Sequence, residues 1–301
     1  MILSDLSDDE IQQALAGDGL NLEIGPFTTC VKSKIPAVID NIRHLYRYNS
    51  LSNTNFADFH IELIASTGLR RFYKPKVNFF FDGRLPFKPL PYAQSFAFFE
   101  WGLNWCVANH AHQYAIVHAA VIEKNGFVAI MPGSPGAGKS TLCAALVNRG
   151  WRLFSDEMAL INPETLHVIP IPRPISLKNE SINIIKSFAP DVEFGLLAED
   201  THKGAITHIM PPKFSIELAG TSAPVKWVIF PKYKSAVPLE LNEMKKAEAA
   251  MQFAEQGFNY NVLGEQGFDV MVSLIDQASV YRLEYSSLDD AVAKFAELSN
   301  E

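Results

Sequence analysis

Apolar and polar positions follow two different periods in the first third of the chain. Apolar residues at helical spacing predict helices, whereas apolar and aromatic runs closed by glycine or Asp-Gly predict strands. The helices are expected at Asp8–Ala16 and Pro36–Tyr46, and the strands at Asn21–Val31, Phe59–Ala65 and Lys76–Phe81. We therefore expect residues 1–95 to form a small mixed α+β domain, and we expect this domain to bind a partner.

A proline-rich segment, Leu85–Pro91, follows this domain. Proline lacks the amide donor that a helix or a central strand needs, so the segment is expected to be a linker. After it, an apolar helix is predicted near Gln94–His110. Further elements are predicted at Val225–Pro231 (strand), Asn242–Gln256 and Asn261–Gln277 (helices), Val280–Tyr285 (strand) and Ser287–Leu298 (helix). Strands mixed with helices indicate an α/β or α+β core, and we expect an α/β domain over residues 96–301.

Composition and charge narrow the functional classes. Hydrophobic residues make up 48% and charged residues 20% of the 301 residues, which is typical of a folded globular protein. The net charge of −7 argues against nucleic-acid binding, which requires clustered lysine and arginine. The amino terminus is acidic, no apolar run is long enough to cross a bilayer, and the 3 cysteines lie far apart. We therefore expect a cytoplasmic protein that binds neither nucleic acid nor membranes.

The most specific motif is a glycine-rich phosphate loop. Its residues are Gly133, Ser134, Pro135, Gly136, Ala137, Gly138, Lys139, Ser140 and Thr141. Glycines allow successive backbone N–H groups to surround phosphate oxygens, and the following helix presents its positive end to them. An apolar strand, Phe127–Met131, enters the loop, and a helix that Gly150 stops leaves it. We expect ATP to bind here, with Lys139 on the β and γ phosphates and Ser140 on Mg²⁺.

Two adjacent acids, Asp156 and Glu157, follow the next apolar run, Trp151–Ser155. A strand, a crossover helix and a second parallel strand form a right-handed unit, and both strands end at the same edge of the sheet. The acids are therefore expected beside the phosphate loop. One carboxylate can bind Mg²⁺ there, and the other can accept the proton of an attacking hydroxyl. A solvated pair at a strand end is the alternative.

His118 lies within the apolar run Ala115–Ile122. Asn125-Gly126 follows, and Asn-Gly between two strands is a strong hairpin signal. Counting back from this turn places His118 opposite Gly133, at the entrance of the phosphate loop. A hydrogen-bonded core histidine is the alternative to an active-site role.

Two later segments carry further cationic residues. Arg173 and Lys178 lie in a proline-containing stretch that cannot be regular helix, and both could face a transferring phosphoryl group. Exposed surface cations are the alternative. Lys203 and His208 lie in the segment Thr201–His208, which we expect to be an ordinary surface loop. A mobile loop over the site is the alternative for that segment.

Together these motifs resemble the HPr kinase/phosphorylase family, and within it the branch called HprK-related kinase A. The resemblance covers about residues 114–180. One position differs, because Ile171 stands where HPr kinases carry an acid. It rests on Val117-His118-Ala119, the loop at 133–140, Arg149–Leu153, Ser155-Asp156-Glu157 and, for the branch, Pro172–Lys178. The family implies a P-loop kinase core related to phosphoenolpyruvate carboxykinase, and relatives often assemble into rings, which implies a homo-oligomer.

The resemblance also implies roles for individual residues. Asp156 corresponds to the general base, Glu157 and Ser140 to magnesium ligands, and His118 to an active-site residue. We expect an ATP- and Mg²⁺-dependent kinase that phosphorylates a hydroxyl, namely a serine of a small protein or peptide. Arg173 would stabilise the transferring group in this interpretation.

Two other functions remain open. A small-molecule kinase of the shikimate or gluconate type also has an acid after the phosphate-loop helix, but such enzymes generally begin with the loop. A nucleotide-binding regulator that transfers no phosphate has no need of an acid pair. A large protein-binding face beside the loop favours a protein acceptor, whereas a closed small pocket favours a small molecule.

Overall fold

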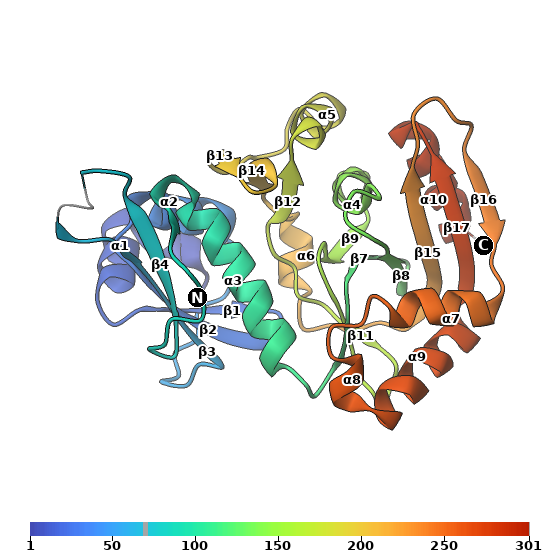
Figure 1. The fold of residues 1–301 in the computed structure, drawn as a ribbon, viewed down its shortest axis with the longest axis horizontal. Coiled ribbons are helices and arrows are strands. Elements are labelled where there is room, and N and C mark those ends of the chain that lie inside the picture. Colours follow the sequence, from blue (N-terminus) through green and yellow to red (C-terminus); the bar gives the residue numbers. More distant parts are fainter. Residues whose placement is uncertain (69–71, 301) are drawn as a thin grey trace.

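The computed structural model describes residues 1–68 and 72–300, which pack into two groups of elements with helix α3 (Ser95–His110) between them (Figure 1). The first group mixes helices with a mostly antiparallel sheet, which agrees with the expectation of a mixed α+β unit. It contains α1 (Asp8–Ala16), β1 (Leu20–Ile24), β2 (Phe27–Ser33), α2 (Pro36–Leu45), β3 (Phe59–Ala65), β4 (Lys76–Phe81), β5 (Leu90–Pro91) and α3. Its strands follow the order β1–β2–β3–β4–β5; β2 and β3 are parallel, and the other neighbours are antiparallel.

Local sequence accounts for the first elements. Ser7 caps α1, because its Oγ accepts a hydrogen bond from the Glu10 amide while the Glu10 carboxylate accepts one from the Ser7 amide. Gly25, with φ of 59°, makes the turn between β1 and β2. The prediction of one strand over 21–31 is therefore wrong, because the glycine reverses the chain there.

Helix α3 covers the sheet of the first group. Phe99 and Leu103 are buried in the same core as Phe79 of β4. Gly102 allows this close approach, because a Cβ at that position would overlap the Phe79 ring. The core is continuous across residue 95, and it also includes Ile116, Met158, Leu160 and Ile171 of the second group.

The predicted linker Leu85–Pro91 also belongs to the first group. Leu90 pairs with Val77 of β4, and the Phe87 ring lies 5.6 Å from the Phe79 ring and 4.5 Å from that of Trp101. Prolines exclude a central strand but permit a short edge strand, which is β5. The segment expected to be a linker is therefore packed into the first group.

The second group extends from residue 115 to residue 300. It contains β6 (Ala115–Val117), β7 (Ala119–Lys124), β8 (Phe127–Pro132), α4 (Lys139–Val147), β9 (Arg152–Ser155), β10 (Ala159–Ile161), β11 (Val168–Ile169), β12 (Ile175–Lys178), α5 (Glu180–Phe188), β13 (Ala198–Thr201), β14 (Gly204–Ile209), α6 (Lys213–Glu217), β15 (Val225–Tyr233), β16 (Glu240–Glu243), α7 (Lys246–Ala254), α8 (Tyr260–Leu263), α9 (Glu265–Gln277), β17 (Ser279–Tyr285) and α10 (Leu288–Asn300). Its main sheet has the order β16–β17–β15–β8–β7–β9. Helices cover both faces of this sheet, which explains why β7 and β8 are apolar throughout their buried length. Ala129 and Met131 pack with α4 and α10, whereas Val128 and Ile130 pack with α7 and α9.

The predicted hairpin and its register are confirmed. Asn125 and Gly126 have φ of 55° and 85°, and β7 pairs with β8 from Lys124–Phe127 to Ala119–Pro132. Both β8 and β9 run antiparallel to β7, so they are parallel to each other, as predicted. They are not neighbours, however, because β7 lies between them.

Two of the carboxyl-terminal helical stretches are shorter than the sequence predicts, whereas the last helix, α10, is as long as expected. The stretch 242–256 begins as strand β16 and becomes helix only at α7, and Gly264, with φ of 57°, separates α8 from α9. The glycine conformation explains the break, because a helix cannot continue through a positive φ. Among the described helices, none is long and apolar enough to cross a membrane.

Candidate active site

The loop at residues 133–138 joins the end of β8 to the start of α4. Gly136 and Gly138 have φ of 88° and 90°, values that residues with a side chain rarely adopt. A Cβ at Gly138 would also lie 2.6 Å from the Tyr285 hydroxyl. The order of strand, loop and helix is the one that the phosphate-loop motif requires. The first-turn amides of α4 have no acceptor within the helix and can bind an anion.

Lys139 is the first residue of α4 and is buried. Its ammonium donates hydrogen bonds to the carbonyl oxygens of Gly133 and Ser134, the latter at 3.2 Å. Burial lowers its pKa to about 8; the Glu157 carboxylate opposes this shift, and the Lys178 charge adds to it. A bound phosphate would favour the charged ammonium, so the surroundings of Lys139 suit an anion.

Asp156 directly follows β9 and is only 3% exposed. Its Oδ2 accepts a hydrogen bond of 2.9 Å from the Ser176 amide. Burial and then the Glu157 charge raise the pKa of Asp156 to about 7, although the Ser176 hydrogen bond and nearby cations lower it. A carboxyl with this pKa can take up and release a proton near neutral pH.

His118 and Lys178 both face Glu157. His118 Nδ1 lies 2.9 Å from the Glu157 carbonyl oxygen and 3.8 Å from its Oε2, and Lys178 Nζ lies 3.8 Å from its Oε1. Burial and then the Lys139 charge lower the pKa of His118, so a neutral ring can donate Nδ1–H to the Glu157 carbonyl. The residues that the sequence singles out at 118, 139, 156 and 157 thus lie in one neighbourhood.

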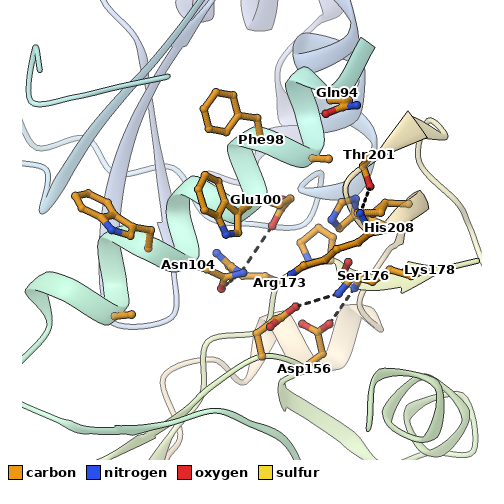
Figure 2. Close-up of a pocket in the computed structure, with 18 of the residues that line it drawn as sticks. Gln94, Phe98, Glu100, Asn104, Asp156, Arg173, Ser176, Lys178, Thr201 and His208 are labelled. Carbon is orange, nitrogen blue, oxygen red and sulfur yellow. Dashed lines mark hydrogen bonds and ion pairs between the residues drawn. The ribbon is translucent and has the colours of Figure 1, made fainter. Parts of the chain in front are cut away.

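A cleft of about 430 Å³ opens beside the two acids, between α3 and the strands β12 and β14 (Figure 2). Asp156, Glu157 and His118 line it, and the charges of both acids raise the pKa of Lys139, while the Lys139 charge lowers that of His118. The other lining residues include Gln94, Phe98, Glu100, Trp101, Asn104, Trp105, Arg173, Ser176, Lys178, Thr201, Lys203, His208 and Phe258. The acids therefore lie between a potential phosphate site and a cavity.

Arg173 lies against α3, next to Asn104 (Figure 2). Its Nη2 donates a hydrogen bond to Asn104 Oδ1 and lies 3.9 Å from Glu100 Oε2. The Lys178 charge, in contrast, lowers the pKa of Lys139, which places Lys178 near the loop. Of the two cations expected at a transferring phosphoryl group, Lys178 is therefore the better placed.

The segment 201–208 forms part of the cleft and is not an ordinary surface loop. It belongs to the hairpin β13–β14, whose second strand pairs with β12, so that Thr201, Lys203 and His208 line the cleft. Gln94 donates a hydrogen bond of 2.9 Å from Nε2 to the Asp200 carbonyl and so attaches the hairpin to the first group. Burial lowers the pKa of His208 to about 3, so its imidazole is neutral.

The sequence does not predict the α3 wall of the cleft. The α3 residues that line the cleft follow helical spacing: Ala97, Phe98, Glu100, Trp101, Asn104, Trp105, Ala108 and Asn109. Because α3 is apolar around its whole circumference, the hydrophobic pattern does not show which face is free. The available signal is Glu100 and Asn104, two polar residues four positions apart in the otherwise apolar middle of the helix.

Ser140 and Glu157 have the donor atoms that Mg²⁺ prefers. The Ser140 side chain is half-buried in the first turn of α4, and the carboxylate of Glu157 is 24% exposed near Lys139. Over residues 1–68 and 72–300, no group of three or more His, Cys, Asp and Glu side chains could hold a metal by itself. A nucleotide-bound Mg²⁺ takes most of its ligands from phosphates and water, so one hydroxyl and one carboxylate fit its needs.

Comparison with known proteins leaves the family unassigned. No family model matches the chain, and no curated protein matches its sequence. Among solved structures, the Hpr(Ser) kinase/phosphatase from Coxiella burnetii is similar over 61% of this chain and 96% of its own, with 14% identity and a TM-score of 0.27. At this TM-score the likeness does not establish a shared fold, and we infer the function from the site itself.

Proposed function

We propose that this protein is an ATP-dependent kinase that transfers the γ-phosphoryl group to a hydroxyl, with a serine of a small protein or peptide as acceptor. The position and acidity of Asp156 carry the proposal. This carboxyl influences the pKa of Lys139 and also lines the cleft, so it can meet both a phosphate at the loop and a hydroxyl in the cleft. Its pKa of about 7 is suited to a general base.

In the proposed reaction, Asp156 accepts the proton of the hydroxyl as its oxygen attacks the γ phosphorus. The Ser176 amide holds Oδ2 of Asp156 and leaves Oδ1 for the acceptor. Lys139 binds the β and γ phosphates. Lys178, 3.8 Å from Glu157, adds positive charge where negative charge spreads over the transferring oxygens.

Ser140 and Glu157 would hold Mg²⁺, which would neutralise charge on the nucleotide phosphates. The ring of His118 donates to the Glu157 carbonyl and packs against Phe258, with ring centroids 5.6 Å apart. His118 is therefore proposed to position the acid pair rather than to transfer a proton.

Phosphoryl transfer from γ-³²P-ATP to an extract of the source cell tests this proposal. The expected result is a labelled acceptor that requires Mg²⁺ and disappears with Lys139→Ala. Lys213→Ala is the matched control, because Lys213 is exposed on α6, where it pairs with Glu217 of the same helix at 3.3 Å and lies over the Tyr48 ring. Transfer that is unchanged in Lys139→Ala would contradict the proposal.

A small-molecule acceptor is the second candidate, and the size of the cleft favours it. Its volume of about 430 Å³ lies within the range of about 300–1,000 Å³ that is usual for small-ligand sites. Separating the labelled extract by size distinguishes the two acceptors. Label in the protein fraction supports the first candidate, and label in the small-molecule fraction supports the second.

A further inference from the structure

Two buried side chains in the cleft have polar atoms without a hydrogen-bond partner among the described residues. They are Nη1 of Arg173, a donor, and Oε2 of Glu100, an acceptor. The two residues are 5% and 3% exposed, and both line the cleft. Leaving such groups unpaired is costly, and native proteins rarely do so without a ligand or a water to satisfy them.

The other contacts of this pair hold it in place. Arg173 Nη2 donates to Asn104 Oδ1, and Glu100 Oε1 accepts a hydrogen bond of 2.6 Å from the Tyr46 hydroxyl. Each residue thus uses one side of its polar group for the protein and leaves the other side free. Arg173 Nη2 and Glu100 Oε2 are 3.9 Å apart, so the two side chains form an ion pair in which Nη1 and Oε2 lack hydrogen bonds.

The unpaired atoms are opposite in polarity, and this restricts what can bind to them. A simple carboxylate would satisfy Arg173 but would be repelled by Glu100. A simple amine would satisfy Glu100 but would be repelled by Arg173. A group with an acceptor and a donor side by side satisfies both. The backbone of an amino acid has this chemistry, either as free carboxylate and ammonium or as the C=O and N–H of a peptide.

The remaining cleft agrees with such a ligand. Asp156 lies on the opposite side of the cleft from α3, where a hydroxyl one carbon away from the backbone would have to point (Figure 2). We propose that the cleft recognises a β-hydroxy amino-acid unit, serine or threonine, through its own backbone: Arg173 binds its carbonyl or carboxylate and Glu100 its N–H. This inference rests on the proposed kinase activity only for the role of Asp156.

Small acceptors that differ by one group test this recognition. We would measure ATP-dependent phosphorylation and, separately, binding by calorimetry for L-serine, N-acetyl-L-serine N-methylamide, glycerate, which lacks the amine, and ethanolamine, which lacks the carboxylate. At least one of the two serine compounds is expected to exceed glycerate and ethanolamine about tenfold in kcat/KM and in affinity, because both unpaired atoms are then satisfied. A preference for free or for capped serine identifies an amino-acid or a peptide acceptor.

Variants assign the two contacts. Arg173→Gln is expected to abolish the advantage of serine over ethanolamine, and Glu100→Gln to reduce its advantage over glycerate. The double variant Glu100→Gln/Arg173→Gln removes both buried charges together. If a single variant does not fold, the double variant should show the loss of the preference for serine over glycerate and ethanolamine. Arg282→Gln, which breaks an exposed ion pair with Glu248, is the control and should behave as the parent.

The two proposals can fail separately. Binding of a serine compound that depends on Arg173, without transfer, would support the recognition and contradict the kinase. Transfer with equal efficiency to glycerate and ethanolamine would support the kinase and overturn the recognition. Absence of both binding and transfer with either serine compound would also overturn the recognition.

Discussion

Replacing Asp156 with asparagine has a consequence for stability that follows from its burial. The carboxyl is 3% exposed, and its pKa is raised from 3.8 to about 7 on folding. One pKa unit corresponds to about 1.4 kcal/mol, so ionising this buried group costs about 4 kcal/mol of folding free energy. Asparagine has nearly the same shape and no charge to bury.

The sign of the pH dependence follows from the direction of the shift. A carboxyl with a raised pKa holds its proton more tightly in the folded than in the unfolded chain. The cost therefore grows as the pH rises from about 4 to about 7 and is constant above that range. Asp156→Asn is expected to be more stable than the parent at pH 8, by up to about 4 kcal/mol, with a smaller difference at pH 5.

Urea unfolding followed by tryptophan fluorescence at pH 5 and pH 8 measures this difference. Asp191→Asn is the matched control, because Asp191 is exposed and its loss should change the unfolding free energy by less than about 0.5 kcal/mol. If Asp156→Asn is no more stable than the parent at pH 8, or if its advantage does not shrink at pH 5, the account of Asp156 as a buried carboxyl that is costly to ionise is refuted.

Three further predictions concern the same site. Below pH 7, kcat/KM for transfer should fall about tenfold per pH unit, because only ionised Asp156 accepts a proton; a flat pH–rate profile would contradict this. Gly138→Ala should weaken ATP binding at least about tenfold in calorimetry, because φ at Gly138 is 90° and the added Cβ would lie 2.6 Å from the Tyr285 hydroxyl. Gly126→Ala is the control and should bind ATP normally, because Gly126 has a similar φ of 85° but nothing lies near its Cβ. Tyr46→Phe removes the donor to Glu100 Oε1 and should lower the unfolding free energy by about 1–3 kcal/mol; an unchanged urea midpoint would contradict the buried hydrogen bond.

The parts of the site that the sequence predicts are those set by local chemistry. Asn125-Gly126 determines the hairpin register, which carries the chain to His118 opposite the phosphate loop. The loop glycines and the crossover bring Asp156 to the same edge of the sheet, although β7 lies between the two parallel strands. Turn residues and the handedness of crossovers act over few residues, so these features can be read without tertiary information.

The cleft could not be predicted in the same way, because its walls come from distant parts of the chain. Arg173 meets Asn104 across 69 residues, and Gln94 meets Asp200 across 106. Helix α3 is apolar on every side, so its pattern gives no sign that one face borders a cavity. The prolines of Leu85–Pro91 indicate a break in regular structure, but they do not show that the segment packs as an edge strand.

The most direct test of the central claim is phosphoryl transfer by Asp156→Asn, measured beside ATP binding by calorimetry. The parent should label its acceptor from γ-³²P-ATP. The variant should transfer phosphate at least about 100-fold more slowly while binding ATP with unchanged affinity. Transfer at the parental rate in the variant would contradict the role of Asp156 as the base. Absence of transfer in the parent, with ATP bound, would contradict the kinase and favour a nucleotide-binding regulator.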